Sequence, residues 1–183
     1  DNAVEFASCL GFPVVLKTAA DEFRHKTDVG GVLLGLETET EVREAYQKLS
    51  ALDSRVAVAE MVESGVEIAF GMVNDSQFGP IVMISAGGTL LEIADDKVFA
   101  LPPFGEDGAK RLLQRLKIAP IFSGVRGCAP VDLGKLSRAL SQFSVICSSF
   151  GDLIAEIDIN PVIASQTGCK VVDAVLVLHP GEG

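Results

Sequence analysis

The spacing of apolar residues is the feature that most restricts how this chain can fold. Short apolar runs typical of strands recur along the sequence, and they are densest between residues 56 and 101. Helical spacing is found in four stretches, residues 3–10, 38–49, 106–117 and 131–149. Because strands mostly follow strands and do not alternate regularly with helices, the pattern predicts an α+β fold with largely antiparallel sheets.

Individual elements can be predicted from the same pattern. Residues 56–62 and 66–73 are typical of two strands joined by Glu63-Ser64-Gly65, a tight-turn sequence. Thr38 and Glu41 form a plausible capping box for the helix that follows. The other strands are expected at residues 14–17, 32–36, 81–86, 89–93, 97–101, 152–159 and 170–178.

Charge and cysteine content restrict the expected partners. The chain has 25 acidic against 15 basic residues and a net charge of −10, so a nucleic acid backbone would be repelled. Its four cysteines are far apart and form no CxxC pair, which argues against a zinc site and a disulfide scaffold. The longest near-apolar stretch, residues 80–91, is too short to span a bilayer, and no signal peptide is recognisable. We therefore expect a cytoplasmic protein that binds neither nucleic acid nor membrane.

The expected strand near residue 158 carries oxygen-bearing side chains on one face. Alternation places Leu153, Ala155, Ile157 and Ile159 on one face and Ile154, Glu156, Asp158 and Asn160 on the other. Asp173 lies alone in the next apolar strand, and a buried carboxylate is costly unless it is paired, hydrogen-bonded or metal-bound. Two facing strands that offer Asp158, Asn160 and Asp173 would suit Mg²⁺. The alternative is an exposed strand face with solvated acids.

Lys17 and the loop after it could bind an anion. Lys17 ends an apolar strand, so its side chain either extends into solvent or meets a phosphate in a cleft. Between Arg24 and Gly31 the sequence gathers basic residues, a threonine and the adjacent Gly30 and Gly31, whose N–H groups could turn toward an anion. A solvated loop is the alternative. His25 in this loop is a candidate nucleophile toward phosphorus or a bystander.

The segment from Glu60 to Glu67 could form a hinge over a nucleotide base. The strand backbone at Glu60 and Val62 can offer one C=O and one N–H to a base edge, and Glu67 could accept hydrogen bonds from ribose hydroxyls. An ordinary hairpin is the alternative.

Taken in order, seven motifs resemble the ATP-grasp domain of NDP-forming acyl-CoA synthetases: PVVLK, HKTDVGGV, EMVESGVEIAFG, FGPIVMISAGGTLLE, ALPPF, EIDINPVIA and VVDA. This family includes the ADP-forming acetate–CoA ligases and is related to the succinyl-CoA synthetase β-subunit. The resemblance runs from about residue 2 to residue 178. It implies an ATP-grasp fold over residues 1–183, with two α+β subdomains, 1–62 and 63–183, and a nucleotide cleft between them. The strand and helix that usually open this fold would precede Asp1, so we expect a truncated fragment.

The resemblance also implies roles for individual residues in binding ATP or ADP and Mg²⁺. The residues matched to nucleotide contacts are Lys17, Gly30, Gly31, Glu60, Met61, Val62 and Glu67. Lys17 would contact the phosphates, the backbone of Glu60 to Val62 would bracket adenine, and Glu67 would hold the ribose. The matched Mg²⁺ ligands are Asn160 and Asp173, with Asp158 close by, where the succinyl branch has a glutamate.

His25 matches the histidine that accepts phosphate in transit in the ADP-forming acetate branch. The family joins a carboxylic acid, CoA and ATP, and it releases acyl-CoA, ADP and phosphate by way of an acyl phosphate. A second phosphohistidine, in a CoA-binding partner domain or subunit, carries the phosphoryl group between distant sites. CoA and the acid would therefore bind outside this chain, which we expect to be inactive as an isolated fragment.

Two departures from the family leave other functions open. Ala100 stands where many relatives have arginine, and the ISAGG segment is less glycine-rich than its equivalent. The alternatives are a regulatory module that has lost phosphoryl transfer and an ATP-grasp ligase of another type. His25 favours the acyl-CoA synthetase over other ligases, and the joint presence of the matched nucleotide and metal residues favours it over a decayed module.

Overall fold

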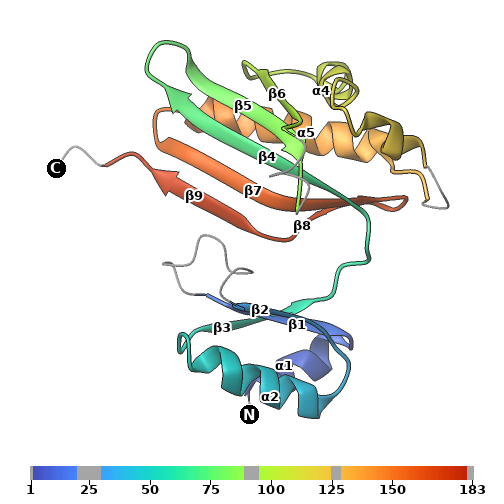
Figure 1. Ribbon diagram of the computed structural model, residues 1–183. Helices are drawn as coiled ribbons and strands as arrows, with labels where there is room; N and C mark the ends of the chain where they lie inside the picture. The colour runs from blue at the N-terminus through green and yellow to red at the C-terminus, as the bar shows by residue number, and fades with distance from the viewer. Residues whose placement is uncertain (1, 20–29, 89–94, 125–128, 181–183) are drawn as a thin grey trace. The chain divides into compact units, whose positions relative to one another are not determined.

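The computed structural model describes residues 2–19, 30–88, 95–124 and 129–180. The chain divides into two compact units, Asp1–Val62 and Glu63–Gly183. Each unit combines an antiparallel sheet with helices that cover one face of the sheet (Figure 1). The predicted α+β class is therefore confirmed.

The first unit is a small sheet covered by two helices. Its helices are α1 (Asn2–Leu10) and α2 (Glu39–Ser50), and its strands are β1 (Val14–Thr18), β2 (Val32–Leu36) and β3 (Val56–Glu60). The strand order is β2-β1-β3, with all pairs antiparallel. Seven buried residues form the core between helices and sheet: Val4, Ala7, Val14, Leu16, Val42, Ala45 and Leu49.

Helix α2 begins at the predicted capping box. The Thr38 hydroxyl accepts a hydrogen bond from Glu41 N at 3.3 Å, and the Glu41 carboxylate accepts from Thr38 N at 2.9 Å and Glu37 N at 2.8 Å. These bonds satisfy N–H groups that have no partner inside the helix. The bond from Glu37 N–H, followed by those from Thr38, holds the pKa of the Glu41 carboxyl below its ordinary value.

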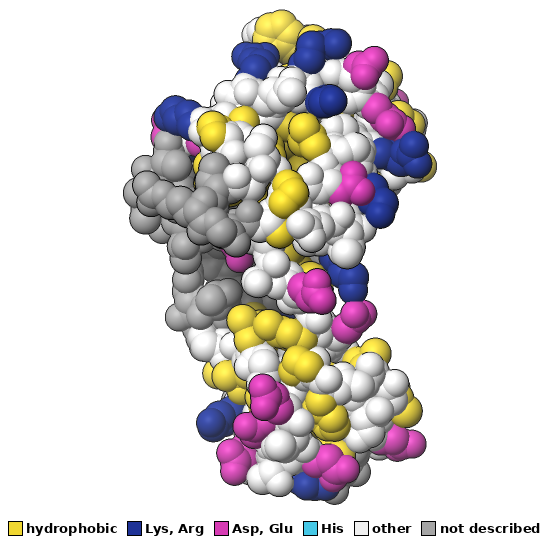
Figure 2. All heavy atoms as spheres, turned by 90° about the vertical axis from the view of Figure 1, so that its right-hand side faces the viewer, with side chains coloured by type: hydrophobic (Ala, Val, Ile, Leu, Met, Phe, Trp, Pro, Cys, Tyr) yellow, Lys and Arg dark blue, Asp and Glu magenta, His cyan; other side chains and the backbone are white. Residues whose placement is uncertain are grey.

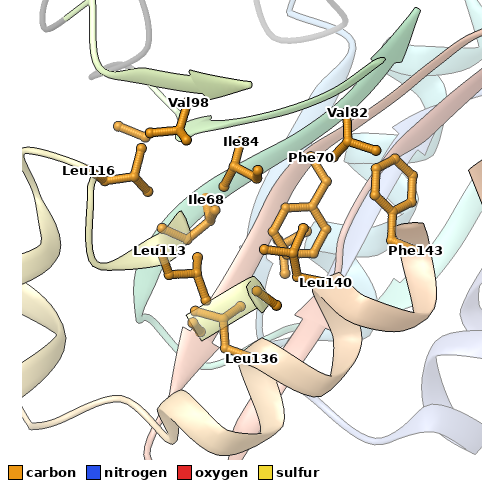
Figure 3. Close-up of a cluster of buried hydrophobic side chains, with 14 of the residues drawn as sticks. Ile68, Phe70, Val82, Ile84, Val98, Leu113, Leu116, Leu136, Leu140 and Phe143 are labelled. Carbon is orange, nitrogen blue, oxygen red and sulfur yellow. The ribbon is translucent and has the colours of Figure 1, made fainter. Parts of the chain in front are cut away.

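The second unit is a six-stranded sheet with its helices on one face. Its elements are β4 (Val66–Asp75), β5 (Gly79–Ala86), β6 (Lys97–Ala100), α4 (Glu106–Leu113), η1 (Ala119–Ser123), α5 (Leu133–Phe150), β7 (Ile154–Ser165), β8 (Gly168–Val171) and β9 (Ala174–Leu178). The strand order is β6-β5-β4-β7-β8, and β9 also pairs with β7. Side chains of α4 and α5 meet those of the central strands in the core, where Leu113, Leu136 and Leu140 lie near Ile68 and Phe70 (Figure 3). The rings of Phe70 and Phe143 stack with centroids 5.8 Å apart.

The predicted tight turn at Glu63-Ser64-Gly65 is wrong. Strand β3 pairs with β1, whereas β4 pairs with β5 and β7, so the two strands flanking this segment lie in different sheets. A Cβ on Gly65 would lie 3.0 Å from the Ala164 carbonyl carbon and closer still to its oxygen. Glycine is therefore needed here because the link passes directly against β7, and not because the chain reverses.

Both helices of the second unit follow their predicted positions, with shifted ends. Asp132 caps α5 by accepting from Lys135 N at 3.0 Å, and α4 ends at Leu113, earlier than the apolar spacing suggested. Arg138 on α5 contacts Glu106 on α4 at 2.9 Å, and charges of both signs are interspersed on the surface of this unit in Figure 2. The strand expected at residues 89–93 lies outside the described residues. Among the helices that the structure describes, none is long and apolar enough to cross a membrane.

Candidate functional site

Asn160 on β7 lies opposite Asp173, which belongs to the short junction between β8 and β9. The stretch 170–178, predicted as one strand, is instead divided into β8 and β9, which are separated by Val172-Asp173. Strands β8 and β9 pair with β7 in the same register, since Val171 lies opposite Val162 and Ala174 lies opposite Ile159. Asn160 N donates to Asp173 O at 3.2 Å across this junction. Directly opposed residues of an antiparallel pair project their side chains to the same face, about 5 Å apart at Cβ.

A bulge in β7 sets the face on which these side chains lie. The core-facing residues of β7 are Ile154, Ile157, Ile159, Val162 and Ala164. Ile68 pairs with Val162 and Phe70 with Ile159, so two residues, Asn160 and Pro161, oppose Ala69 alone. The oxygen-bearing side chains of Asp158 and Asn160 therefore lie on the sheet face away from α4 and α5, as the sequence predicted. Asp158 is exposed, and Asn160 and Asp173 are half-buried.

The predicted alternation is wrong at the start of β7. Ile154 was expected on the polar face with Glu156, but it is 6% exposed and belongs to the core, whereas Leu153 is 62% exposed. A register shift between Ile154 and Glu156 in the pairing with β9 breaks the period of two at this point.

Glu67 and the glycine pair of ISAGG lie beside Asn160. Gly87 N donates to Glu67 O at 2.8 Å, and Gly88 N donates to Asn160 Oδ1 at 3.4 Å. A Cβ on Gly88 would overlap Glu67 Oε2 and would lie 2.8 Å from Glu67 Cδ. The carboxylate of Glu67 and the amide of Asn160 therefore flank Gly88 on the face of the sheet that carries Asp158. The sequence showed this glycine pair only as a departure from a richer motif, and its contacts with Glu67 and Asn160 were not predicted.

The donor set of Asn160 and Asp173 fits Mg²⁺. This ion is usually held by one or two protein oxygens together with phosphate and water, and not by a complete protein cage. An amide oxygen and a carboxylate on opposed residues supply that number, and Asp158 adds a second carboxylate two residues along β7. Among the described residues there is no group of three His, Cys, Asp or Glu side chains that could hold a metal by themselves.

In the first unit, Lys17 lies on the sheet face away from the helices. Its neighbours Leu16 and Thr18 are fully buried, so alternation directs the half-buried Lys17 to the opposite face. There it is paired with Val32 on β2 and Ala57 on β3. Both of these cross-strand neighbours have short apolar side chains.

The outer edge of β3 carries the backbone groups expected to face a base. Met61 N donates to Pro13 O at 3.4 Å, so Met61 directs its N–H toward β1. Successive residues of a strand direct their backbone groups to opposite sides, which turns the C=O of Glu60 and the N–H of Val62 to the outer edge. Because β3 is the edge strand of its sheet, no strand of the part of the chain that the structure describes pairs with this edge.

The predicted anion loop is described only at its end. His25 lies outside the described residues, together with Arg24, Lys26 and the rest of the segment 20–29. Gly30 has a φ of +67° and is exposed, in keeping with a turn that favours glycine. Gly31 is buried, and its C=O accepts a hydrogen bond from Thr18 N at 2.8 Å, which extends the pairing of β1 and β2.

Comparison with known proteins gives this arrangement a family. Residues 1–178 match the ATP-grasp domain family. The chain belongs to that family, and the resemblance seen in its motifs is confirmed.

Within the family, the chain is homologous to the ATP-grasp part of ADP-forming acyl-CoA ligases. It is 33% identical to the β-subunit of acetate–CoA ligase (ADP-forming) I from Pyrococcus furiosus, over 97% of this chain and 80% of that subunit. It is 34% identical to the 4-hydroxybutyrate–CoA ligase (ADP-forming) of Nitrosopumilus maritimus, over 94% of this chain but 26% of that enzyme. The chain thus spans most of one relative and about a quarter of the other.

Solved structures agree with this homology. Acetyl-coenzyme A synthetase 1 of Ca. Korarchaeum cryptofilum, in complex with coenzyme A and Ca-AMPCP, matches with a TM-score of 0.90 and 38% identity, over 97% of this chain and 81% of that one. A second structure of that synthetase contains Mg-AMPPCP, and its phosphohistidine segment points towards the nucleotide binding site. It matches with a TM-score of 0.85 and 40% identity, again over 97% of this chain and 81% of that one.

Proposed function

We propose that this chain binds Mg²⁺ and ATP and forms the phosphoryl-transferring part of an ADP-forming acyl-CoA ligase. The observation that carries the proposal is the hydrogen bond from Asn160 N to Asp173 O, which brings a residue with an amide oxygen next to a residue with a carboxylate. Homology to acetate–CoA ligase β-subunits and to a synthetase solved with Mg-AMPPCP supports the same ligand.

The described residues have distinct tasks in this proposal. Lys17 meets the phosphates as a point charge, and the outer edge of β3 at Glu60 to Val62 receives the adenine. Glu67 accepts hydrogen bonds from the ribose hydroxyls. The glycines of the first unit, Gly30 and Gly31, approach the phosphates, where a side chain would stand in the way.

Mg²⁺ would be held by Asn160 and Asp173, with Asp158 close by. When bound, the ion would neutralise charge on the phosphate oxygens during transfer. The chain itself supplies orientation, because Asn160 and Asp173 are held in register by β7 and its edge strands.

His25 is the proposed acceptor of the phosphoryl group. The bond between the γ-phosphorus and its bridging oxygen breaks, ADP leaves, and a bond forms between phosphorus and an imidazole nitrogen. The group then passes to a second histidine on a CoA-binding partner domain or subunit, where the carboxylic acid becomes an acyl phosphate and CoA displaces phosphate. We expect this partner to bind CoA and the acid, and we expect the complete enzyme to be cytoplasmic.

Calorimetric titration of ATP into the chain, with Mg²⁺ and separately with EDTA, tests the nucleotide site. We expect Mg²⁺-dependent binding that is lost when Asn160→Ala and Asp173→Ala are combined. Asp152→Ala is the matched control, because this exposed carboxylate precedes the same strand and has no proposed ligand role. If the folded chain does not bind ATP at millimolar concentration, the proposed function is wrong.

The phosphoryl acceptor is tested separately with the two histidines of the chain. His25→Ala is expected to bind Mg·ATP but to take up no phosphate from a phosphorylated partner or from ATP. His179→Ala is the control, because His179 contacts Asn74 at 3.1 Å in the second unit and has no proposed role in the reaction. Equal phosphorylation of the two variants would rule out His25 as the acceptor.

A further inference from the structure

Gly88 occupies a position where two proposed ligand-binding groups meet. It has a φ of +60°, and a Cβ there would overlap the carboxylate of Glu67. Its N–H donates to Asn160 Oδ1 at 3.4 Å. Gly87, the residue before it, also has no space for a side chain, because a Cβ there would lie 2.8 Å from Ile68 N. The glycine pair is therefore pressed against the start of β4 on one side and reaches Asn160 on the other.

The hydrogen bond from Gly88 affects how Asn160 presents its side chain. An asparagine amide ends in an oxygen that accepts and a nitrogen that only donates, and a half-turn about the last bond exchanges them. Only the oxygen can bind a cation. A backbone N–H that points at this amide selects the orientation with Oδ1 on its side, and the second lone pair of Oδ1 is left for a metal.

The missing side chain of Gly88 affects Glu67 in a different way. The Glu67 carboxylate lies in the volume that any other residue at position 88 would fill. A Cβ would displace the carboxylate from this position or would move the backbone at position 88. In either case the distance between the Glu67 and Asn160 groups would change.

We propose that Gly88 is a positioning residue that sets Glu67 and Asn160 together, so that ribose binding and Mg²⁺ binding both depend on one glycine. This inference rests on the proposed function and adds to it a residue that makes no contact with the reacting atoms. It also distinguishes two reasons why glycine is required at position 88, namely its left-handed backbone conformation and its lack of a side chain. If only the left-handed backbone mattered, asparagine would serve, since it tolerates this conformation well. If the space mattered, asparagine would fail as alanine does.

The test compares variants of the full chain at two glycines. Gly79 has a φ of +72° at the first position of β5, and a Cβ there would meet no atom within 4 Å. Gly79→Ala therefore imposes a similar backbone strain without the contact, and the melting temperatures of Gly79→Ala and Gly88→Ala show whether both chains are folded. Affinity for AMPPCP is measured by calorimetry, with Mg²⁺ and with EDTA.

Gly88→Ala and Gly88→Asn are each expected to weaken Mg·AMPPCP binding by about tenfold or more, the usual effect of disturbing a group that orients a metal ligand. Gly79→Ala is expected to stay within about twofold of the unsubstituted chain. In EDTA the loss caused by Gly88→Ala should be smaller, because only the Glu67 contribution is then affected. Without any ligand, the side-chain amide signals of Asn160 in a nitrogen–proton NMR spectrum should shift in Gly88→Ala and not in Gly79→Ala.

Three results would overturn the inference while leaving the proposed function intact. They are full affinity in Gly88→Ala, recovery of affinity in Gly88→Asn, and an unchanged Asn160 amide signal in the folded Gly88→Ala chain. A chain without substitutions that does not bind Mg·AMPPCP would overturn the proposed function and this inference together.

Discussion

Replacing Gly65 with alanine tests how the two units are connected. A Cβ at this position would lie 3.0 Å from both the Ala164 carbonyl carbon and Ile163 Cγ2, and closer still to the Ala164 oxygen. Gly65 is not in the left-handed region, so alanine adds no backbone strain there and the effect is one of space alone.

The cost follows from what Ala164 can do in response. Ala164 is fully buried and is paired with Val66 on β4 and Cys169 on β8, so a shift of its backbone would disturb the pairing with both strands. Overpacking of this kind costs about 1–3 kcal/mol. A ladder hydrogen bond lost in relieving it adds about 1 kcal/mol. We therefore expect Gly65→Ala to lower the free energy of unfolding by about 2–4 kcal/mol.

Urea unfolding followed by far-ultraviolet circular dichroism measures this cost, since the chain has no tryptophan for fluorescence. Gly134→Ala is the control, because Gly134 is exposed in the first turn of α5 and a Cβ there meets only Asp132 Oδ1 at 3.4 Å. Alanine favours a helix over glycine, so this control should be neutral or stabilising. Harmless surface substitutions change the free energy of unfolding by no more than about 0.5 kcal/mol. If Gly65→Ala changes it by no more than this, β7 does not constrain the conformation of the chain at Gly65.

Three further outcomes are expected. Glu41→Ala should lower the melting temperature at neutral pH. Because the pKa of Glu41 is lowered in the folded chain, its stabilisation is present above the ordinary carboxyl pKa and is lost as the pH falls through the lowered value, so the two melting curves should converge in acid. Burial raises the pKa of Cys147 to about 11, so timed iodoacetamide labelling read by peptide mass spectrometry should modify exposed Cys9 first, and equal rates would contradict its burial. The outer edge of β3 offers a C=O and an N–H in the order that complements adenine and opposes guanine, so competition calorimetry should show Mg·GTP binding at least about tenfold more weakly than Mg·ATP.

The elements that could be predicted are those with a local cause. The α2 helix has its start signalled by Thr38 and Glu41, and the caps act within one turn. Strands β1, β2, β4 and β5 are short apolar runs bounded by polar or glycine residues, and each was expected close to its observed position. The Mg²⁺ ligand roles of Asn160 and Asp173 stay a prediction, which rests on oxygen-bearing side chains in apolar strands and on the resemblance to the family.

The wrong predictions concern positions whose structure is set by pairing with strands that are far away in the sequence. A tight turn at Glu63-Ser64-Gly65 was a reasonable prediction from local residues, but β3 and β4 find their partners in different sheets. Ile154 was assigned to the wrong face because a register shift against β9 interrupts the alternation. Neither the sheet to which β3 and β4 belong nor the register shift against β9 can be predicted from neighbouring residues, because strand pairing depends on residues far along the chain.

By itself, the sequence determined the class of fold, most of the elements and the identity of the oxygen-bearing residues, because periodicity and side-chain chemistry are properties of neighbouring residues. Only the tertiary structure decided that Asn160 stands opposite Asp173 and that Gly88 lies between Glu67 and Asn160. Those relations are made by four segments of the chain whose distances in space are set by sheet register and packing.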